Sequence, residues 1–266
     1  MIVIDNSLFF EITEQFQISC FNQTKAYLSF YADDEIDEKV LCFIDSPDDP
    51  HIACLGHIKS CLGIRMLWIE GICIKNHEYD SDLIKHFYEG LKTLDFSIIE
   101  INTNLIYNPE YEIGIREAGF LRPVGNFSVS LSKWINLQEE ISYNSNWKRN
   151  LKNAQSFGFN FVIKENITEN EAVQLSSLYN RFAYKKGFPH RLNPRYLSKL
   201  LNTPHFSVAM VLSDEEPVSF IVYHKLHKHA GLYFSARNSL VDQNGAAFRM
   251  YDYLCTALSK GGSHTV

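Results

Sequence analysis

The feature that most constrains the fold is a junction, found three times, in which a helix-like segment ends in glycine followed by phenylalanine. The three copies read REAGF (116–120), QSFGF (155–159) and KKGF (185–188). Strand-like and helix-like segments alternate in both halves of the 266-residue chain, and the second half repeats the plan of the first. This repetition favours two related α/β units in tandem, residues 1–140 and 141–266, each with a mixed, mostly antiparallel sheet flanked by helices. One continuous α+β domain is the alternative.

Local signals place the elements of each half. Helix starts are marked by a capping residue before a periodic apolar run, as at Asn108-Pro109, Asn146, Thr168 with Glu171, and Asn193-Pro194. Strands are expected where β-branched and aromatic residues form runs bounded by Gly, Pro or Asp. The expected helices cover residues 81–94, 109–118, 146–158, 168–187, 193–201 and 244–260, and the expected strands cover 39–45, 51–60, 64–74, 96–103, 126–132, 159–163, 205–213, 217–227 and 229–236.

Composition limits the class of protein. Hydrophobic residues make up 45% of the chain and charged residues 21%, which is enough apolar surface for a sizeable core. No apolar run is long enough to cross a bilayer, and the start lacks the layout of a signal peptide. The six cysteines show no CxxC spacing and fall mostly in strand-like segments, which indicates buried, reduced thiols. We therefore expect a cytoplasmic protein.

Charge is distributed unevenly along the chain. Residues 1–140 carry 10 basic and 23 acidic side chains, whereas residues 141–213 carry 10 basic and only 3 acidic ones. A positive band inside a protein of net charge −6 indicates a local anionic ligand. The alternative is that the band faces the acidic half and neutralises it.

Several catalytic motifs are missing from the sequence. The chain has no GxSxG, HExxH or GxxxxGK[ST] segment, which removes most support for nucleotide-driven phosphoryl transfer and for zinc proteolysis. His224, His227 and His229 are close in sequence, and two of them could converge on a metal from one face of a strand. Because they fall where a hairpin should turn, with no Cys or carboxylate beside them, we expect solvated turn histidines and no metal site.

The segment DQNGAAFRMYDYL (242–254) is a candidate binding site for an anion. Gly245, Ala246 and Ala247 follow a strand and open a helix, so their N–H groups could receive a phosphate or a developing oxyanion. The alternative is an ordinary helix start whose small residues allow tight packing.

Two further groups of residues are candidates for substrate contact. The cationic segment KKGFPHRLNPRYLSKL (185–200) suits recognition of phosphate or carboxylate, and a solvated basic surface is the alternative. Alternate residues of a strand point one way, so Tyr233, Ser235 and Arg237 could line one cleft, unless Tyr233 packs in the core.

The stretch NFSVSLSKWINLQEEISYNSNWKRNLKNAQSFGFNFVI (126–163) resembles the middle of the Fem family (FemA, FemB and FemX). In that family a strand ending in Leu-Ser leads through a short polar segment to a basic R-x-x-[IL]-[KR]-x-A-x-x-x-G helix. The segments LYNRFAYKKGFPHRLNPRYLSKLL (178–201) and REAGFLRPVGNFSVSL (116–131) are similar to the family's next block and to the end of its first domain. The resemblance covers roughly residues 50–266. The helix motif is matched by Arg149, Leu151, Lys152, Ala154 and Gly158. Arg149 and Leu151 are closer together in sequence than the corresponding residues of some family members.

The resemblance implies tandem GNAT-fold domains that transfer an acyl or aminoacyl group to an amine. Fem members use aminoacyl-tRNA as donor and a peptidoglycan precursor as acceptor, whereas related cytoplasmic proteins are acetyltransferases of the acyl-CoA type. Either donor is therefore open here, the acceptor is expected to be anionic, and no cofactor is expected to be tightly bound. The expected roles are substrate binding by Lys186, Arg191, Tyr196 and Arg237, catalysis by Tyr233 and Ser235, and donor binding by Gly245, Ala246 and Ala247.

Two departures from the family pattern bear on these expectations. The acyl-CoA loop of ordinary GNAT enzymes reads [RQ]-x-x-G-x-[GA], and here Asp242 puts a carboxylate at its first position, where it would repel a pyrophosphate. The sequence also stops at KGGSHTV (260–266), before the family's final strands, which are expected to supply a catalytic lysine. We expect direct attack of the acceptor amine on an ester or thioester carbonyl, without a covalent enzyme intermediate. The alternative function is a non-catalytic module that binds an anionic glycan precursor or RNA. The sequence favours no particular oligomeric state for either function.

Overall fold

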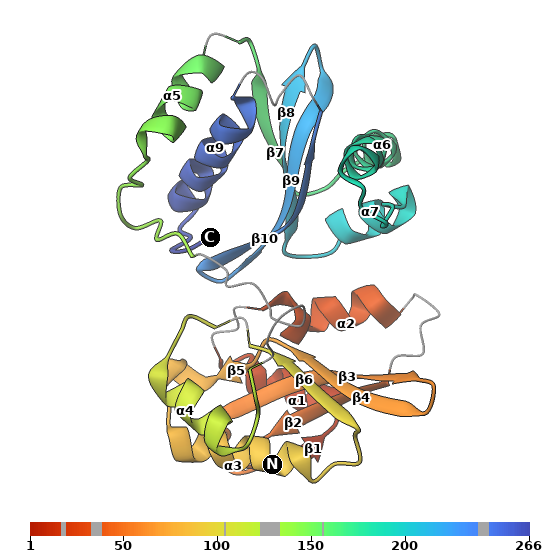
Figure 1. Ribbon diagram of the computed structural model, residues 1–266, viewed down its shortest axis with the longest axis vertical. Coiled ribbons are helices and arrows are strands. Elements are labelled where there is room, and N and C mark those ends of the chain that lie inside the picture. Colours follow the sequence, from red (N-terminus) through yellow and green to blue (C-terminus); the bar gives the residue numbers. More distant parts are fainter. Residues whose placement is uncertain (17–19, 33–38, 104, 123–133, 156, 239–244) are drawn as a thin grey trace. The chain divides into compact units, whose positions relative to one another are not determined.

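The computed structural model describes residues 1–16, 20–32, 39–103, 105–122, 134–155, 157–238 and 245–266. The chain divides into two compact units, Met1–Lys133 and Trp134–Val266, each built on its own sheet (Figure 1). The expected fold class, α/β with mixed, mostly antiparallel sheets flanked by helices, is confirmed. Leu137 is 4% exposed and packs into the core of the second unit, so residues 134–140 belong with that unit and not with the first.

The first unit has a sheet of order β1-β2-β3-β4-β6, in which the β4–β6 pair alone is parallel among the described strands. Its elements in chain order are β1 (Ile2–Ile4), α1 (Asn6–Thr13), the 3-10 helix η1 (Phe21–Gln23), α2 (Lys25–Ala32), β2 (Lys39–Ile44), β3 (Ile52–Cys61), β4 (Ile64–Glu70), β5 (Cys73–Ile74), η2 (Lys75–His77), α3 (Ser81–Lys92), β6 (Ile98–Asn102) and α4 (Pro109–Glu117). The elements before residue 39 were not predicted from the sequence.

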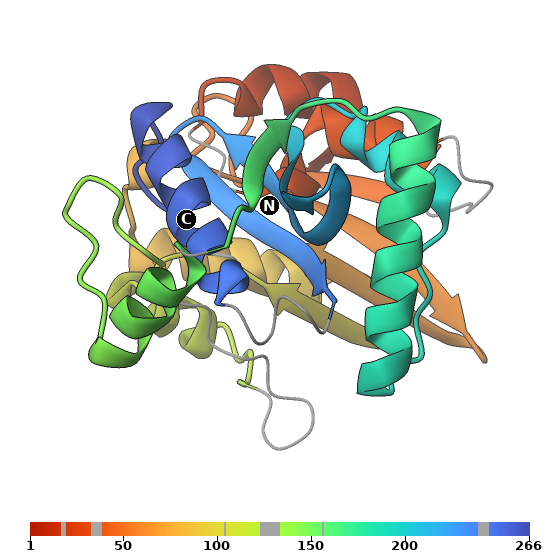
Figure 2. The same ribbon diagram turned by 90° about the horizontal axis from the view of Figure 1, so that it is seen from above.

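The second unit has an antiparallel sheet of order β10-β9-β8-β7. Helices α5 and α9 cover one face of this sheet and α6 and α7 cover the other (Figure 1), and the view from above separates blue α9 from teal α6 in the same way (Figure 2). The elements are α5 (Ser145–Ala154), β7 (Asn160–Lys164), α6 (Glu169–Lys186), α7 (Pro194–Leu201), β8 (Phe206–Ser213), β9 (Glu216–Leu226), β10 (His229–Arg237) and α9 (Ala246–Lys260).

The two units share one order of elements. Leaving aside α5, the 3-10 helices and the short β5, each unit runs strand, helix, helix, three antiparallel strands, helix. The first unit continues with β6, which pairs in parallel with the last strand of its meander. In the second unit Thr265 forms a parallel bridge to His229 at the corresponding place. Helix α3 of the first unit is therefore equivalent to α9 of the second.

Local capping chemistry was predicted accurately. Asn108 caps α4 with Pro109 in its first turn, and Asn193 caps α7 with Pro194 in its first turn. Thr168 and Glu171 form a capping box at the start of α6, which ends at the left-handed Gly187. One cap was wrong: Asn144, and not Asn146, accepts the hydrogen bond from the Trp147 N–H at the start of α5. The strand expected at 126–132 lies outside the described residues.

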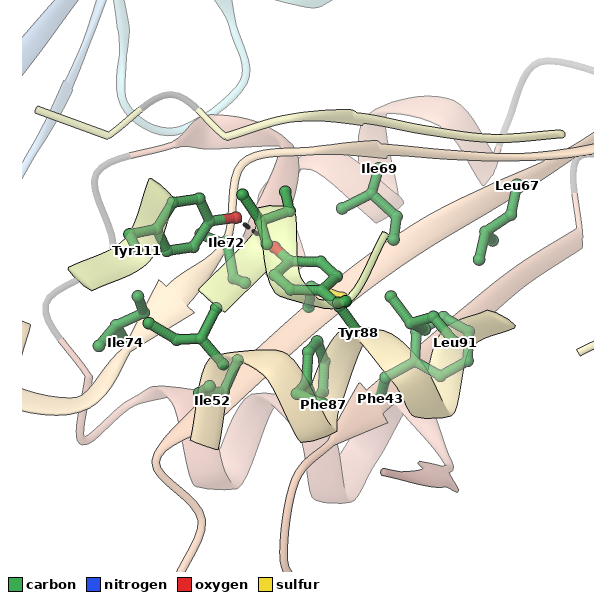
Figure 3. Packing of buried hydrophobic residues seen from close by; sticks show 14 residues of the cluster. Phe43, Ile52, Leu67, Ile69, Ile72, Ile74, Phe87, Tyr88, Leu91 and Tyr111 are labelled. Carbon is green, nitrogen blue, oxygen red and sulfur yellow. Dashed lines mark hydrogen bonds between the residues drawn. The ribbon is translucent and has the colours of Figure 1, made fainter. Parts of the chain in front are cut away.

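The core of the first unit lies between the sheet and helices α3 and α4 (Figure 3). Its buried residues include Tyr88 and Tyr111, whose hydroxyls hydrogen bond to each other and so satisfy one another away from water. Burial raises the pKa of both hydroxyls, so both remain protonated. The cysteines whose side chains the structure describes are buried and form no disulfide with one another, as expected: Cys20, Cys42, Cys54, Cys73 and Cys255.

A buried glutamine repairs a gap in the first sheet. The sequence predicted one strand over 64–74, but Gly71 adopts a left-handed φ of 82° and splits it into β4 and β5. Leu55 of β3 pairs with Cys42 of β2 on one side, but the gap leaves it without a strand partner on the side of β4 and β5. The Gln23 side chain, fully buried, donates to the carbonyls of Leu55 (3.0 Å) and Glu70 (2.7 Å) and accepts from the Leu55 N–H (2.7 Å). Its amide therefore stands in for the missing rung of the ladder.

Candidate functional site

The junction of α6 and α7 carries an uncompensated positive charge. No Asp or Glu occurs between Glu171 and Asp214, while six Lys and Arg residues fall between 181 and 199. In the described part of the second unit no carboxylate forms an ion pair with four of these cations, all exposed: Lys185, Lys186, Arg191 and Arg195. Cations at the end of α6 also suit the helix dipole, but three of the six follow that helix and gain nothing from it.

The loop between α6 and α7 is held in a fixed conformation. The Asn180 side chain accepts from the Leu192 N–H (2.8 Å) and donates to the Leu192 carbonyl (3.1 Å), which ties the loop to α6. Within the loop, Nη1 of Arg191 donates to the carbonyls of Phe188 (3.0 Å) and His190 (3.4 Å). Since a guanidinium has five N–H donors, the others remain for a ligand. The predicted substrate contact Arg191 is thus positioned by backbone on an exposed loop.

A shallow groove lies beside these cations. It has a volume of about 530 Å³ and runs along one side of α6 to the start of α7 at Pro194. Arg181 lines it and donates to the Ser177 hydroxyl (3.1 Å). Asn180 lines the groove and also anchors the Arg191 loop, so groove and loop are one surface. Of the other predicted contacts, Lys186 is exposed near Phe182, and Tyr196 is half-buried in α7.

The structure separates Tyr233 from Ser235 and Arg237. Leu232 pairs with Tyr223 of β9 and Phe234 with the adjacent Val222, so Tyr233 is the extra residue of a β-bulge. Tyr233 contacts the rings of Phe206 (5.4 Å) and Phe234 (5.6 Å), whose face of the sheet is the one covered by α6 and α7.

Ser235 pairs with Ile221 and Arg237 with Ser219, and Ile221 belongs to the core beneath α9. The three side chains therefore do not line one cleft, because the extra residue of the bulge breaks the simple alternation. Only Tyr233 shares a face with the α6–α7 cations.

The start of α9 is covered by α5. Gly245 is left-handed, with φ of 68°, and a Cβ there would overlap the carbonyl oxygen of Asn150 in α5. Gly245, Ala246 and Ala247 are all buried. The N–H groups predicted to receive a donor phosphate are therefore beneath a helix, and the packing alternative describes these residues. Asp242 lies outside the described residues.

Aromatic packing holds α5 in that position. The ring of Trp147 stacks on Tyr143 at 5.3 Å and meets Phe248 of α9 edge-on at 4.8 Å. The Tyr143 hydroxyl donates to Asp252 of α9 (3.0 Å). As predicted, the lysines of α5 lie on its exposed face. The basic sequence of α5 is the outer side of a packed helix.

The equivalent helix start in the first unit is closed to anions in another way. The carboxylate of Asp80 caps α3 by accepting from the Leu83 N–H (3.0 Å), and Asp82 adds a second negative charge in the first turn. The Asp80 carboxylate occupies an N–H group that a phosphate would need, and the negative charges of both carboxylates would repel the phosphate. Neither of the two equivalent helices thus offers an open anion site.

The three neighbouring histidines have different surroundings. His227 is exposed in the β9–β10 turn, but His224 is largely buried on β9 beside Phe206, and His229 bonds Thr265 (2.7 Å). The expectation of solvated turn histidines is therefore wrong for His224, because the strand continues past it to Leu226. Among the described residues no group of three His, Cys, Asp or Glu side chains is placed to hold a metal ion.

His224 is expected to make the second unit sensitive to acid. Burial, with the nearby His205, lowers the pKa of His224 from 6.5 to about 4. Because the unfolded chain binds this proton below pH 6.5 and the folded chain does so only near pH 4, stability falls as the pH drops through that window. The loss is about 2–3 kcal/mol.

Urea unfolding at pH 7, 5.5 and 4.5 measures this effect. His224→Gln should remove that part of the pH dependence, and the exposed control His190→Gln should keep it. Equal slopes for wild type and His224→Gln would contradict the assignment.

Comparison with known proteins identifies the fold. No family model and no curated protein matches the sequence. Among solved structures, FemX is similar over 100% of this chain and 87% of its own, with a TM-score of 0.72 at 10% identity. L-PGS from Bacillus licheniformis is similar over 98% of this chain and 74% of its own (TM-score 0.59, 11% identity).

The C-terminal domain of a putative lysylphosphatidylglycerol synthetase from Agrobacterium fabrum is similar over 86% of this chain and 68% of its own (TM-score 0.56, 13% identity). No described helix is both long and apolar enough to span a membrane. The likeness to FemX covers both units, in agreement with the motifs read from the sequence. This chain therefore has the Fem-type fold, with two α/β units in tandem.

Proposed function

We propose that this chain is an aminoacyltransferase that moves an aminoacyl group from an activated ester to the amine of an anionic acceptor. The uncompensated cations at the α6–α7 junction carry the proposal, because they offer an exposed, rigid site for phosphate or carboxylate. The Fem-type fold supports transfer chemistry, and one protein of similar fold is named for an aminoacylated, anionic lipid. Arg191 and Lys186 would hold the acceptor, and Tyr233 is the candidate for contact with the reacting groups.

An ester donor is favoured over acyl-CoA. An acyl-CoA pyrophosphate needs free N–H groups at a helix start. Of the two equivalent helix starts, that of α3 is capped by Asp80 and that of α9 is covered by α5. Aminoacyl-tRNA carries its aminoacyl group as an ester and would not need a pyrophosphate site at either helix start. In the proposed step the acceptor nitrogen attacks the ester carbonyl, the bond from the carbonyl carbon to the ribose oxygen breaks, and one proton passes from the nitrogen to that oxygen.

The chemistry of the described thiols supports direct attack. Burial raises the pKa of Cys255 to about 11 and of Cys42 to about 12, so neither is a thiolate near neutral pH. Cys54 and Cys73 are shifted in the same direction. The enzyme would therefore contribute positioning and stabilisation of the developing oxyanion.

Arg191→Ala tests the acceptor site. We expect its affinity for a UDP-linked peptidoglycan precursor to fall about tenfold or more, since a charge-assisted hydrogen bond to an anion is lost. Isothermal titration at two salt concentrations measures the affinity and its electrostatic part. The matched control is Arg149→Ala, an exposed arginine on α5 at the opposite face of the sheet. Unchanged affinity in Arg191→Ala, or an equal loss in the control, would remove this role.

Single-turnover transfer from aminoacyl-tRNA decides between catalysis and binding alone. A labelled aminoacyl group appearing on the acceptor supports the proposal. Binding of the precursor without transfer would instead favour a non-catalytic module for an anionic glycan precursor, which the same cations could serve.

A further inference from the structure

A second pocket, of about 540 Å³, lies at the end of the second sheet where α9 finishes. The β7–α6 loop, the α7–β8 loop, the last part of β9 and the C-terminal turn of α9 form its walls. The cations of the α6–α7 junction are not among its lining residues. This pocket is therefore distinct from the acceptor site proposed above.

Strand register brings polar side chains together on one face at this end of the sheet. Ser207 pairs with Tyr223, and both follow the alternation of core residues that face α9. Lys225, two residues beyond Tyr223, points the same way, and its N–H donates to the carbonyl of His205 (2.8 Å). Glu165 directly follows β7, whose last residue Lys164 pairs with Val208, and so lies beside Ser207 in the pocket lining. Four polar side chains thus meet where the helix no longer covers the sheet.

The pocket carries one negative and one positive wall. Glu165 is exposed and makes no hydrogen bond or ion pair within the described residues. The Lys225 ammonium donates to the Gly261 carbonyl at the end of α9 (2.6 Å), which fixes it and leaves two N–H donors. Strand β8 separates β7 from β9, so these two strands lie about 10 Å apart, and Lys225 is offset from Glu165 by two residues along the strand direction. Because both side chains reach into the pocket, the distance between the carboxylate and the ammonium suits a small molecule bound between them.

Neutral groups and an apolar floor complete the site. Burial and the charge of the neighbouring His227 lower the pKa of His205, which keeps its ring neutral near pH 7. His205 has a φ of 77°, a strained conformation for a residue with a side chain. The apolar part of the lining consists of Ile163, Pro204, Phe206, Ala257 and Leu258.

We propose that this pocket binds a small zwitterion, an α-amino acid or a short peptide, with its ammonium on Glu165 and its carboxylate on Lys225. A simple anion would meet the Glu165 carboxylate and a simple cation would meet the Lys225 ammonium. A zwitterion meets an opposite charge at both ends, and its side chain faces the apolar floor. This site goes beyond the proposed transfer reaction and does not depend on it.

Titration of the full chain with four probes at pH 7 tests the site without any substitution. L-Alanine or L-alanyl-L-alanine should bind, and the better of the two tells an amino acid from a peptide. N-Acetylalanine lacks the ammonium and alaninamide lacks the carboxylate, so each should bind at least about tenfold more weakly. Absence of binding by both zwitterions, or equal binding by the derivatives, would overturn the proposal.

Two variants assign the charges. Lys225→Met should weaken binding of the zwitterion about tenfold and leave binding of alaninamide unaffected. Glu165→Gln should also weaken binding of the zwitterion about tenfold, and it should leave binding of N-acetylalanine unaffected. The matched controls are Lys228→Met and Glu169→Gln, which make the same charge changes at exposed residues outside the lining. Equal losses in the controls would overturn the assignment. Arg191→Ala should leave zwitterion binding unchanged, so failure here and failure of the acceptor site are distinguishable.

Discussion

Replacing Gly245 with alanine is expected to destabilise the second unit by about 3 kcal/mol, through backbone strain together with overpacking. Gly245 has a left-handed φ, and its missing Cβ leaves room for the Asn150 carbonyl of α5. The obstacle is backbone, so relief requires α5 to move away from α9. That movement would disturb the edge-on contact of Trp147 with Phe248 of α9. Urea unfolding with Trp fluorescence measures the loss of stability.

Gly187→Ala is the matched control for this prediction. Gly187 has a similar left-handed φ, 71°, but no atom lies within 4 Å of the place where its Cβ would be. It isolates the backbone strain, which costs about 1 kcal/mol. If Gly245→Ala costs no more than Gly187→Ala, α5 does not press on the start of α9, and the argument against a donor phosphate at that helix fails.

Replacing Gln23 with leucine is expected to destabilise the first unit by about 3 kcal/mol, since several buried hydrogen bonds are lost together. Leucine keeps the volume but leaves the Leu55 N–H and the carbonyls of Leu55 and Glu70 without the amide that they bond. Urea unfolding gives the size of the loss. Hydrogen exchange at the Leu55 amide reports its place, and protection there should fall.

Asn22→Leu is the control for the Gln23 variant. Asn22 is the preceding residue and is only partly buried. Its side chain donates to the Glu70 carboxylate (3.0 Å) and accepts from the Cys20 thiol (3.7 Å). We expect a cost of about 1 kcal/mol or less from its removal. Equal costs for the two variants, with unchanged exchange at Leu55, would show that Gln23 does not replace a rung of the ladder.

What the sequence could predict was decided by short-range chemistry. The caps at Asn108, Thr168 and Asn193 involve residues two or three positions apart, so they are visible in the sequence. The repeated plan of strands and helices is also local in each segment, and together with the Fem-type motifs it gave the fold class. The basic α6–α7 segment was recognised because charge is a property of composition.

What the sequence could not predict depends on pairing between distant segments. The bulge at Tyr233 is defined by the pairing of β10 with β9, so the sequence of β10 alone does not predict it. The burial of Gly245 depends on α5, about a hundred residues earlier in the chain. Glu165 and Lys225 were missed for the same reason, since the sheet register alone places them in one pocket. In each of these cases the sequence identifies the residue but does not show which distant residue lies next to it in the fold.

The bulge in β10 also affects how this chain should be compared with its relatives. At that place β10 holds one residue more than the strand beside it, so a related strand without a bulge would be one residue shorter. An alignment that opens no gap there would match residues of one face with residues of the other from that point to the end of the strand. At 10% identity to FemX, a single missing gap would make Ser235 and Arg237 look like counterparts of side chains beneath α6.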